Sequence, residues 1–370
     1  MTKIQWTDET WNPIRGCSIE SAGCKNCYAM GMADRISRMQ PDSNYSETVQ
    51  RVKGKPVWTG KIVKTPLKTL TAPMRWRKPR MVFVNSMGDL FHPNVPFEWI
   101  DEVFAIMAMA PQHTFQILTK HPKRMREYIC EFNPAKSWDP QDPKNHFPYF
   151  TRDGVSVLDR PLDEVMFPVK DGWPLPNVWL GVSAENQAMA NLRIPKLLET
   201  PAAKRFVSLE PLLGEIDLIK TTYRYGGFGV TFAGFLKDEN EYDDYHYFQP
   251  KLDWVIVGGE SGPNARHMRA DWVRQIVKDC QSTSVPVFVK QMGRRIYDRN
   301  DIGFCGEDKS DWALDDEYAQ VNMSPHGYID EAQGADCLIT LRHHKGGIPS
   351  EWPEDLRIRQ TPEIELCRKK

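Results

Sequence analysis

Three cysteines close together near the start of the chain could hold one metal centre. Cys17, Cys24 and Cys27 have the spacing Cys-x6-Cys-x2-Cys, and Tyr28 follows the last of them. Thiolates are ligands for soft metals, which makes an iron–sulfur cluster or a zinc ion the candidate occupant. A closed structural zinc site needs a fourth ligand, and none lies nearby in the sequence. Three thiolates on a four-iron cluster would instead leave one coordination position open for chemistry.

Polar or glycine residues also follow nearly every apolar segment that the sequence predicts as a strand. These strand-end groups are Asn85, Ser86 and Asp89; Thr119 and Lys120; Ser183, Glu185 and Asn186; Ser208 and Glu210; Gly259, Glu260 and Ser261; and Lys290 and Gln291. In a parallel (β/α) barrel the carboxyl ends of all strands meet at one mouth. In an open doubly wound sheet only a few ends meet, at the switch point. The distribution therefore favours a barrel and predicts one shared pocket.

Several of these side chains have chemistry suited to a ligand or a reaction. A lysine at a barrel mouth can bind a phosphate or a carboxylate, or act as an acid. Lys120, Lys290 and Glu210 are therefore the candidate catalytic residues, with no choice made among them. The pair Gly258-Gly259 would let a ligand approach the backbone closely, because glycine has no Cβ atom.

The elements that must position these residues form a repeating strand–helix pattern. Apolar strand-like segments are predicted at about 81–86, 114–119, 178–183, 205–209, 253–257 and 285–290. Helix-compatible segments are predicted at about 29–39, 99–109, 122–130, 187–198 and 271–282. The strands are apolar throughout rather than alternating, as strands buried on both faces are. The pattern predicts an α/β fold with a partial or full parallel (β/α) barrel, and an open doubly wound sheet is the alternative.

Two segments break this pattern and are predicted as insertions. Residues 131–173 are rich in Pro and Asp, and residues 220–250 are aromatic and acidic. We therefore assign residues 1–293 to the barrel with its insertions, and residues 294–370 to an irregular C-terminal extension. The extension would pack on the barrel, where it could cover the open edge or close the mouth.

Length and composition suit a soluble globular protein with a sizeable core. The chain has 370 residues, of which 41% are hydrophobic and 26% charged. It contains no run of about eighteen apolar residues, and its first residues lack the apolar core of a signal peptide. We therefore expect a cytoplasmic protein that does not enter a membrane. The cysteines outside the loop show no disulfide spacing, as expected of thiols in a reducing compartment.

The formal net charge of −1 hides an uneven distribution along the chain. Residues 1–80 carry 15 Lys and Arg against 6 Asp and Glu, a net charge of +9, so the remainder sums to −10. A basic leading segment favours a polyanionic partner, although a solvated surface explains it equally well. Two stretches, 76–80 and 120–124, place cations next to a tryptophan or a histidine. Cations neutralise backbone phosphates and aromatic rings stack on bases, so we expect a nucleic acid as partner, with DNA favoured.

A three-cysteine loop that leads a parallel β/α pattern resembles the radical S-adenosylmethionine superfamily. The usual spacing there is Cys-x3-Cys-x2-Cys, whereas this chain has six residues in the first gap. In that superfamily an aromatic residue usually precedes the last cysteine. In this chain Asn26 stands at that position, and the aromatic residue Tyr28 follows the cysteine instead. More closely, the chain is similar to a phage-associated three-cysteine-motif family of uncharacterised proteins, a divergent branch of that superfamily. The matching stretches lie at 6–8, 10–13, 23–29, 85–92, 116–120, 180–186, 208–212, 258–262, 289–291 and 351–356.

The resemblance implies a mechanism as well as a barrel of the radical S-adenosylmethionine type. Cys17, Cys24 and Cys27 would be the metal ligands of a four-iron four-sulfur cluster, whose free iron binds S-adenosylmethionine. One electron from an external donor such as a flavodoxin or ferredoxin would cleave that cofactor to methionine and a 5′-deoxyadenosyl radical, which abstracts a substrate hydrogen. The protein would orient the cofactor and exclude water.

The same resemblance implies which residues contact S-adenosylmethionine. Asp89 would bind its ammonium group, and Ser183 and Glu185 would hold its ribose or carboxylate. Glu210 and Glu260 would bind ribose hydroxyls, the sulfonium or the substrate. The full expected set is Tyr28, Ser86, Asp89, Ser183, Glu185, Glu210, Gly258, Gly259 and Glu260.

The resemblance and the charge pattern together suggest a nucleic-acid substrate. The leading hypothesis is radical modification of a DNA base, such as rearrangement or hypermodification of a thymine side chain in phage DNA, in the cytoplasm of a bacterial host. The base would have to be flipped out of the duplex. The alternatives are radical repair of a DNA lesion, radical modification of RNA or a peptide, and a zinc-stabilised nucleic-acid-binding protein without catalysis. Action only together with a partner protein also stays open.

Overall fold

Seven parallel strands form the frame on which the rest of the chain packs. The structure, a computed structural model, describes residues 4–131, 173–220, 222–225, 230–236, 250–262, 264–293, 295–298, 337–340, 345 and 347–363. The strands of the sheet are β1 (Glu9–Trp11), β6 (Met81–Val84), β7 (Thr114–Thr119), β8 (Val178–Ser183), β9 (Lys204–Leu209), β12 (Trp254–Gly258) and β14 (Val287–Gln291). They lie in the order β1-β6-β7-β8-β9-β12-β14, and every neighbouring pair is parallel.

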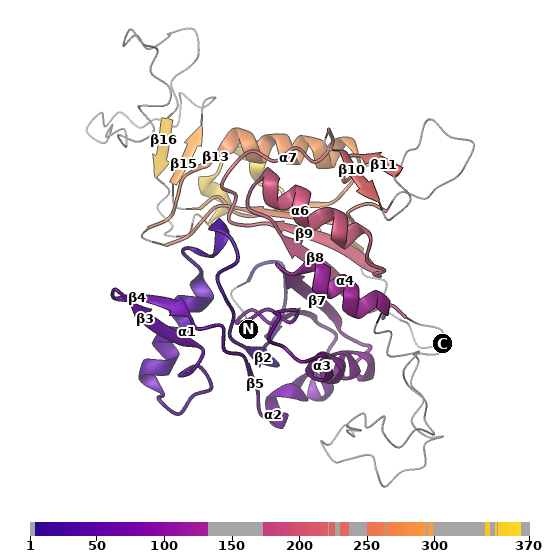
Figure 1. Cartoon of the computed structure of the whole chain (residues 1–370). Coiled ribbons are helices and arrows are strands. Elements are labelled where there is room, and N and C mark those ends of the chain that lie inside the picture. The colour runs from indigo at the N-terminus through magenta and orange to yellow at the C-terminus, as the bar shows by residue number, and fades with distance from the viewer. Residues whose placement is uncertain are drawn as a thin grey trace, which may run out of the picture.

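The order of these strands decides between the predicted architectures. A doubly wound sheet reverses its strand order at a switch point. Here each strand lies beside the next one along the chain without a reversal, and the sheet curls in one direction as a half-barrel (Figure 1). The prediction of a partial (β/α) barrel is confirmed, and that of a full barrel is wrong. β1 and β14 stay at opposite edges, since closure of such a barrel takes about eight strands.

Helices between the strands cover one face of the half-barrel. They are α3 (Phe97–Met109), α4 (Pro122–Glu131), α6 (Gln187–Leu198) and α7 (Ala270–Ser282), all close to their predicted positions. Their buried residues form one apolar core with strand residues such as Val84, Val182 and Val257. None of the helices that the structure describes is long and apolar enough to cross a membrane.

The opposite, concave face of the sheet carries a second apolar cluster. Its members are Trp6, Phe83, Trp179, Phe206, Trp254, Ile256 and Phe288. The ring centroid of Trp254 lies 6.0 Å from that of Trp6 and 6.1 Å from that of Trp179. Because both faces of the sheet are apolar, its strands have the continuous apolar sequences that predicted a parallel arrangement.

Before β6 the chain builds a lobe that stands off one side of the half-barrel (Figure 1). It contains α1 (Tyr28–Met39) and the antiparallel hairpin of β3 (Val49–Val52) and β4 (Lys55–Trp58). We call residues 25–61 the hairpin lobe. The short strands β2 (Ile14–Arg15) and β5 (Val63–Lys64) pair where the chain enters and leaves it, and α2 (Leu67–Leu70) follows.

The segments predicted as insertions are described only in part. Residues 132–172 of the first one lie outside the described residues. The second begins as a hairpin of β10 (Thr222–Tyr225) and β11 (Val230–Ala233). After this hairpin, Phe235 N donates a hydrogen bond to Leu218 O at 2.7 Å, and Leu252 N donates to Phe235 O at 3.0 Å. Phe235 is fully buried, so this segment returns to the apolar core after its hairpin.

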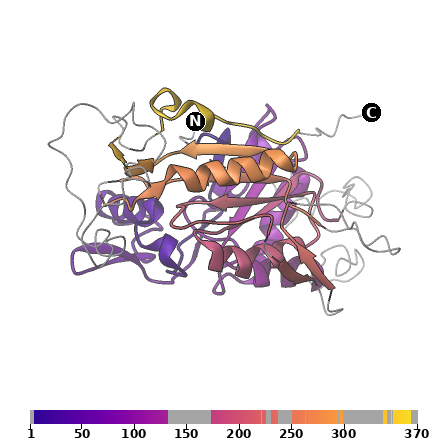
Figure 2. The ribbon, with the colours of Figure 1, turned by 90° about the horizontal axis from the view of Figure 1, so that it is seen from above.

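Part of the predicted C-terminal extension covers the open edge of the sheet. Val289 N donates to Ile358 O and Gln360 N donates to Val287 O, both at 2.9 Å, so residues 358–360 of the segment 347–363 pair along β14. Figure 2 shows this segment beside β14. An edge strand left unpaired invites association with other chains. Of the two predicted placements, over the edge or over the mouth, these described residues show the first.

A small sheet and several short turns complete the described chain. β13 (Met268–Arg269), β15 (Arg295–Asp298) and β16 (Cys337–Thr340) form a three-stranded sheet beside α7. Turns of 3-10 helix span Ala22–Cys24, Ala72–Arg75, Pro349–Glu351 and Glu354–Leu356. The small sheet crosses the predicted boundary at residue 293, because β13 precedes that boundary and β15 and β16 follow it.

Trp352 tests whether the segment along β14 belongs to the folded core. Trp352→Ala should lower the free energy of unfolding by about 3–5 kcal/mol, because a fully buried tryptophan is lost and a cavity remains. Denaturant unfolding followed by circular dichroism measures it. Ile348, which is 42% exposed, is the control, and Ile348→Ala should change the value by less than about 0.5 kcal/mol. Equally small effects of both substitutions would show that the segment does not stabilise the fold.

Candidate active site

Polar groups at the carboxyl edge of the sheet come together in one pocket. The predicted residues that line it are Cys17, Cys24, Cys27, Tyr28, Ser86, Asp89, Lys120, Ser183, Glu210, Gly259, Glu260 and Lys290. They come from the cysteine segment and from the ends of six strands, as the sequence predicted. The volume of about 250 Å³ is several times the ~30 Å³ of one water molecule, so a small-molecule ligand has room. Glu185 and Gly258 are not among the lining residues.

The cysteine loop, residues 16–27, begins at a backbone contact that glycine allows. Gly16 has a φ of +101°, and a Cβ atom there would lie 2.2 Å from the carbonyl oxygen of Lys61. A Cβ atom on Gly88 would lie 2.9 Å from Gly16 O. The loop therefore starts against the segment that follows β6. It ends at Cys27, which is the N-cap residue of α1.

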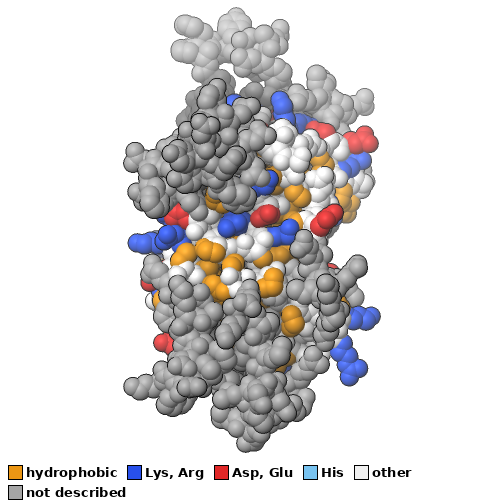
Figure 3. Space-filling model, turned by 90° about the vertical axis from the view of Figure 1, so that its right-hand side faces the viewer, with side chains coloured by type: hydrophobic (Ala, Val, Ile, Leu, Met, Phe, Trp, Pro, Cys, Tyr) orange, Lys and Arg blue, Asp and Glu red, His pale blue; other side chains and the backbone are white. Residues whose placement is uncertain are grey.

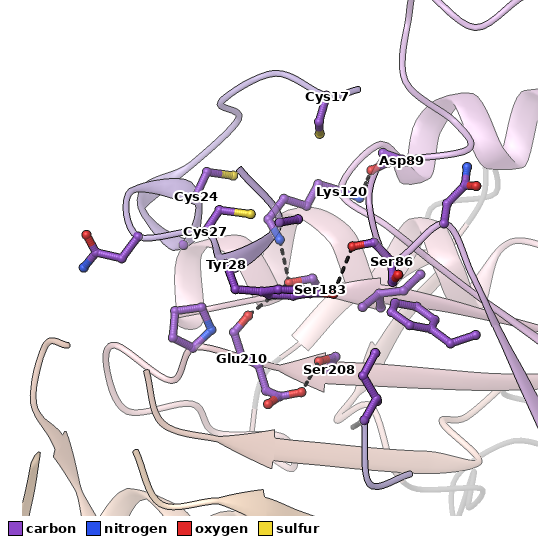
Figure 4. A pocket seen from close by; sticks show the side chains of 18 of the residues that line it. Cys17, Cys24, Cys27, Tyr28, Ser86, Asp89, Lys120, Ser183, Ser208 and Glu210 are labelled. Carbon is purple, nitrogen blue, oxygen red and sulfur yellow. Dashed lines mark hydrogen bonds between the residues drawn. The ribbon is translucent and has the colours of Figure 1, made fainter. Parts of the chain in front are cut away.

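All three thiols of the cysteine loop line the pocket (Figure 4). Burial raises the pKa of Cys17, and the charge of Asp89 raises it further. Burial also raises the pKa of Cys27, but the backbone N–H groups of Met30 and Ala29 at the start of α1 oppose this. Both thiols keep their protons in such surroundings, and a bound metal would displace these protons.

Apolar side chains pack against the thiols. Cys17 and Cys27 contact a cluster that includes Tyr45 and Trp58 of the hairpin lobe and Met87 after β6. An apolar shell of this kind limits the access of water to a metal site. Within the described part of the chain, no group of three or more His, Cys, Asp or Glu side chains is arranged so that it could hold a metal ion.

Glu185, just after β8, holds the cysteine loop. Its side chain is fully buried, and Oε1 accepts a hydrogen bond from Gly23 N at 3.1 Å. Oε2 forms an ion pair with Arg193 Nη1 of α6 at 3.3 Å. Burial raises the pKa of Glu185, but the Ser21 hydroxyl, the Gly23 amide and the charges of Arg193 and Lys120 together more than offset this and hold it below the usual value. Glu185 is therefore a fixed, charged anchor next to Cys24.

Glu260, after β12, holds the loop at a second point. Asn26 Nδ2 donates to Glu260 Oε2 and to Asn264 O, both at 2.9 Å. Arg266 binds the same carboxylate, with Nη2 2.7 Å from Oε1 and the backbone N 2.8 Å from Oε2. Burial raises the pKa of Glu260, but the hydrogen bonds from Arg266 outweigh it and lower the pKa. Glu260 lines the pocket, yet protein donors already engage both of its oxygens.

Asp89 lines the pocket near Cys17 and is locked in place by three donors. Thr119 Oγ1 lies 2.6 Å from Oδ1, Phe91 N lies 3.0 Å from Oδ1, and Lys120 N lies 2.9 Å from Oδ2. The side chain therefore ties the segment after β6 to the end of β7. It also keeps a carboxylate at a fixed position in the pocket wall.

His92 holds the residue that follows Cys17. Its Nδ1 accepts a hydrogen bond from Asn94 N at 3.1 Å, so the proton of the neutral ring lies on Nε2. Nε2 in turn donates to Ser18 Oγ. Burial lowers the pKa of His92, and the neighbouring His121 lowers it further, so the ring stays neutral. A buried neutral histidine thus fixes the first part of the cysteine loop.

A chain of hydrogen bonds joins the strand ends on another side of the pocket (Figure 4). Lys120 Nζ donates to Ser183 Oγ at 2.8 Å, and Ser183 Oγ donates to Glu210 O at 3.3 Å. Glu210 Oε1 lies 2.9 Å from Lys290 Nζ, and Oε2 accepts from Ser208 Oγ at 3.1 Å. Lys290 has a carboxylate partner, whereas the side chain of Lys120 donates to a hydroxyl. Lys120 is therefore the better placed cation for an anionic group of a ligand.

Tyr28 and Ser86 meet at the rim of the pocket. Tyr28 is 56% exposed, and its hydroxyl donates to Ser86 O at 2.9 Å. Ser86 Oγ donates to Asn12 Oδ1 at 3.2 Å. The ring of Tyr28 is therefore open to solvent beside the thiols, where a flat ligand can stack on it.

Gly258 and Gly259 were expected to let a ligand approach the backbone closely. In the structure, other atoms of the protein occupy that space. A Cβ atom on Gly258 would lie 2.8 Å from Glu210 Oε1. A Cβ atom on Gly259 would lie 2.4 Å from Met292 O. The two glycines let β12 pack against the neighbouring strand ends, and Gly259 also lines the pocket.

Several residues that shape the site were not predicted from the sequence. Asn26, His92 and Asn12 hold the loop and the rim through side-chain hydrogen bonds. Trp58 reaches the pocket from the hairpin, and Trp6 reaches it from the N-terminal segment. Asn26 stands directly before the last cysteine, and Trp6, Asn12 and His92 lie in stretches that match the resembled family. No local pattern marks their role in the site, because their partners lie far away in sequence.

The two basic stretches predicted to contact nucleic acid lie at different edges of the sheet. Residues 76–80 precede β6, which places them at the amino edge, opposite the pocket, and Arg80 pairs with Glu9 at 2.8 Å. Residues 120–124 follow β7 at the pocket edge, but Arg124 donates to Val95 O. Figure 3 shows side chains of both charges mixed with hydrophobic ones on the described part of one face. That face therefore has a mixed charge.

Comparison with protein families places the chain in one of them. A family model described as "Protein of unknown function (DUF5131)" matches residues 1–332. The chain belongs to this family. No curated protein and no solved structure matched it. The DUF5131 match takes in the cysteine loop, all seven strands of the half-barrel and both predicted insertions, and it ends before the residues that cover β14.

Asn26 tests whether the sheet holds the cysteine loop. Asn26→Ala removes the hydrogen bonds to Glu260 and Asn264 and should let this end of the loop open more often. In the metal-free variant, iodoacetamide should alkylate Cys24 and Cys27 roughly fivefold faster than in the metal-free native chain. This factor corresponds to a decrease of about 1 kcal/mol in the free energy of local opening. Peptide mass spectrometry measures the rates.

Lys25→Ala is the matched control for this substitution. Lys25 is exposed on the same loop, and its side chain makes no ion pair with a described residue. The alkylation rates of this variant should stay close to those of the native chain. Native rates in the Asn26→Ala variant as well would mean that other contacts hold the loop.

Proposed function

We propose that this protein is a radical S-adenosylmethionine enzyme that acts on a nucleic-acid base. The observation that carries the proposal is that Cys17, Cys24 and Cys27 share one pocket with the polar ends of six parallel strands. Three thiols beside a cavity suit a four-iron cluster that leaves one iron open to a ligand. A parallel half-barrel suits the proposal too, because the carboxyl ends of six of its seven strands meet around that cavity.

Three thiols in an apolar shell are the donor set that such a cluster needs, and they would have to draw together to bind it, because in this structure the described side chains form no metal-holding group. Cys17, Cys24 and Cys27 would hold it, and Trp58 and Met87 would limit the access of water. The chemistry that the cluster supplies, given one electron by an external flavodoxin- or ferredoxin-type donor, is cleavage of S-adenosylmethionine to methionine and a 5′-deoxyadenosyl radical, which takes a hydrogen atom from the substrate. The other residues of the pocket have to bind and orient S-adenosylmethionine and the substrate, and to keep water away from them.

The polar residues divide into those that hold the loop and those that remain for ligands. Glu185 and Glu260, which the resemblance assigns to S-adenosylmethionine, already accept from the loop and from arginines. Lys120 and Ser183 remain to donate to the methionine carboxylate. Asp89 lines the pocket on the Cys17 side, and because three protein donors occupy three of about four lone-pair sites of its carboxylate, one site would accept from the ammonium group.

The ion pair of Glu210 and Lys290 is the proposed proton-transfer group. The two side chains are 14% and 23% exposed and both line the pocket. Glu210 is held by Ser208, so the position of Lys290 Nζ is fixed relative to the strand ends. Lys290 would donate a proton to the substrate, and Glu210 would balance its charge before the transfer.

The walls of the pocket support a flat aromatic substrate. Trp6 and Phe83 line it with ring centroids 4.7 Å apart, and Tyr28 stands exposed at the rim. Aromatic side chains stack on bases of any sequence. A base inside a duplex cannot reach such a pocket, so it would have to flip out. Thymine in phage DNA, within a bacterial cytoplasm, is the favoured target because of the family resemblance.

Metal content separates this proposal from a zinc-stabilised nucleic-acid-binding protein. Anaerobically reconstituted native chain should contain about four irons and four sulfides and should form 5′-deoxyadenosine from S-adenosylmethionine. Cys24→Ala should lose both properties, because one of three ligands is gone. Cys130→Ala, at an exposed cysteine on α4, is the control and should keep them. One zinc and no iron in the native chain, or normal turnover by Cys24→Ala, would contradict the assignment.

The substrate is tested by following the hydrogen that the radical removes. The reconstituted enzyme, with S-adenosylmethionine and a reductant, is incubated with DNA that carries deuterium on the thymine methyl group. Mass spectrometry should find deuterium in the 5′-deoxyadenosine, because a hydrogen atom moves from the base to the 5′ carbon. DNA deuterated on cytosine is the control. Deuterium transfer from cytosine alone, or from neither DNA, would exclude thymine as the target.

A further inference from the structure

The hairpin lobe carries part of the positive charge of the leading segment, and residues 62–80, which precede β6, carry the larger part, +6. Residues 25–61 contain seven Lys and Arg and three Asp and Glu, a net charge of +4. The β3–β4 hairpin contains three cations and no acidic residue. Arg51 pairs with Asp34 of α1 at 2.9 Å, whereas Lys53 and Lys55 are exposed and pair with no acidic side chain among the described residues. Two cations therefore stand unpaired at the tip of the hairpin.

The β3–β4 hairpin runs from these cations at its tip to the pocket at its other end. Lys53 (φ +50°) and Gly54 (φ +78°) form a two-residue turn of the kind that fits twisted antiparallel strands. Trp58, at the other end of β4, lines the pocket. Lys55 and Trp58 are three positions apart on β4, about 10 Å along the strand, and their side chains point to opposite faces of the hairpin.

A second exposed face of the lobe, on the side of α1 opposite the residues that pack against the hairpin, reaches the rim of the pocket. Tyr28, Met32 and Met39 are 56%, 43% and 70% exposed, and Arg35 is exposed as well. Their spacing of four, three and four residues places all of them on one side of the helix. An exposed aromatic ring beside cations is the combination that proteins use to hold single nucleic-acid strands.

We propose that the hairpin lobe binds the sugar-phosphate backbone of the DNA strand whose base enters the pocket. Lys53 and Lys55 neutralise phosphates, and Tyr28 stacks on a base next to the flipped-out one. A strand held on the lobe passes the pocket rim, because α1 and β4 contribute residues to both. The inference rests on the proposed function for the nature of the substrate.

The chain offers a matched control at the opposite edge of the sheet. Arg77 and Lys78 are exposed and precede β6, so they lie at the amino edge, away from the pocket. Reversing both charges there changes the net charge as much as reversing Lys53 and Lys55. The comparison therefore separates an effect of position from an effect of total charge.

The test is fluorescence anisotropy of a fluorescein-labelled, single-stranded DNA 20-mer with the full chain between 50 and 200 mM salt. K53E/K55E should bind at least about tenfold more weakly at 50 mM salt, with a salt slope smaller by about 1.4, the value for two lost phosphate contacts on a single strand. R77E/K78E should bind within about twofold of the native chain. Unchanged thermal unfolding of both variants shows that they fold.

The outcomes of this experiment test DNA binding by the hairpin lobe separately from the proposed radical reaction. Equal weakening by the two double variants would overturn the inference, since only total charge would then matter. Failure of the native chain to bind the DNA would overturn it as well. If K53E/K55E alone loses binding while it still assembles iron and forms 5′-deoxyadenosine, the lobe is the docking surface. A native chain that takes up no iron but binds DNA through the lobe would refute the proposed function and leave the inference standing.

Discussion

The attachment of the cysteine loop to the carboxyl edge of the sheet is the constraint on which the site depends. Glu185 holds Gly23 from the end of β8, and Glu260 holds Asn26 from the end of β12. Each carboxylate also has an arginine partner, and loss of one member of a buried ion pair is costly. His92 holds the other part of the loop from the segment after β6. The thiols therefore reach their places only when the half-barrel has assembled.

This attachment determines which polar groups remain for ligands. Glu185 and Glu260 are engaged by the loop, so the groups that remain for a ligand are Asp89, Lys120, Ser183 and the pair of Glu210 and Lys290. The hairpin lobe completes the site in two ways. It packs apolar side chains against the thiols, and at its tip it carries Lys53 and Lys55, which are exposed and pair with no acidic side chain in the described part of the chain. Shielding of the proposed cluster and docking of a polyanion would thus belong to one structural unit.

The sequence predicted the frame of the fold well and the details of the site less well. Segments such as 178–183 were recognisable as strands because they are buried on both faces, and the polar groups after them met in one pocket as expected. Incomplete closure was not predictable, because it depends on the number of strands and on what covers β14. The role of Glu185 and Glu260 in holding the cysteine loop could not be predicted for a similar reason. It is set by Gly23 and Asn26, which lie 162 and 234 residues away in sequence.

The central claim is that three cysteines hold one iron–sulfur cluster whose remaining iron is open to S-adenosylmethionine. Electron paramagnetic resonance of the reconstituted and reduced native chain tests it most directly, recorded before and after S-adenosylmethionine is added. We expect the signal of a reduced four-iron cluster before the addition. The signal should change clearly when S-adenosylmethionine is added, because this cofactor binds the iron that no cysteine holds. A signal that stays the same, or no cluster signal from a chain that contains one zinc ion, would contradict it.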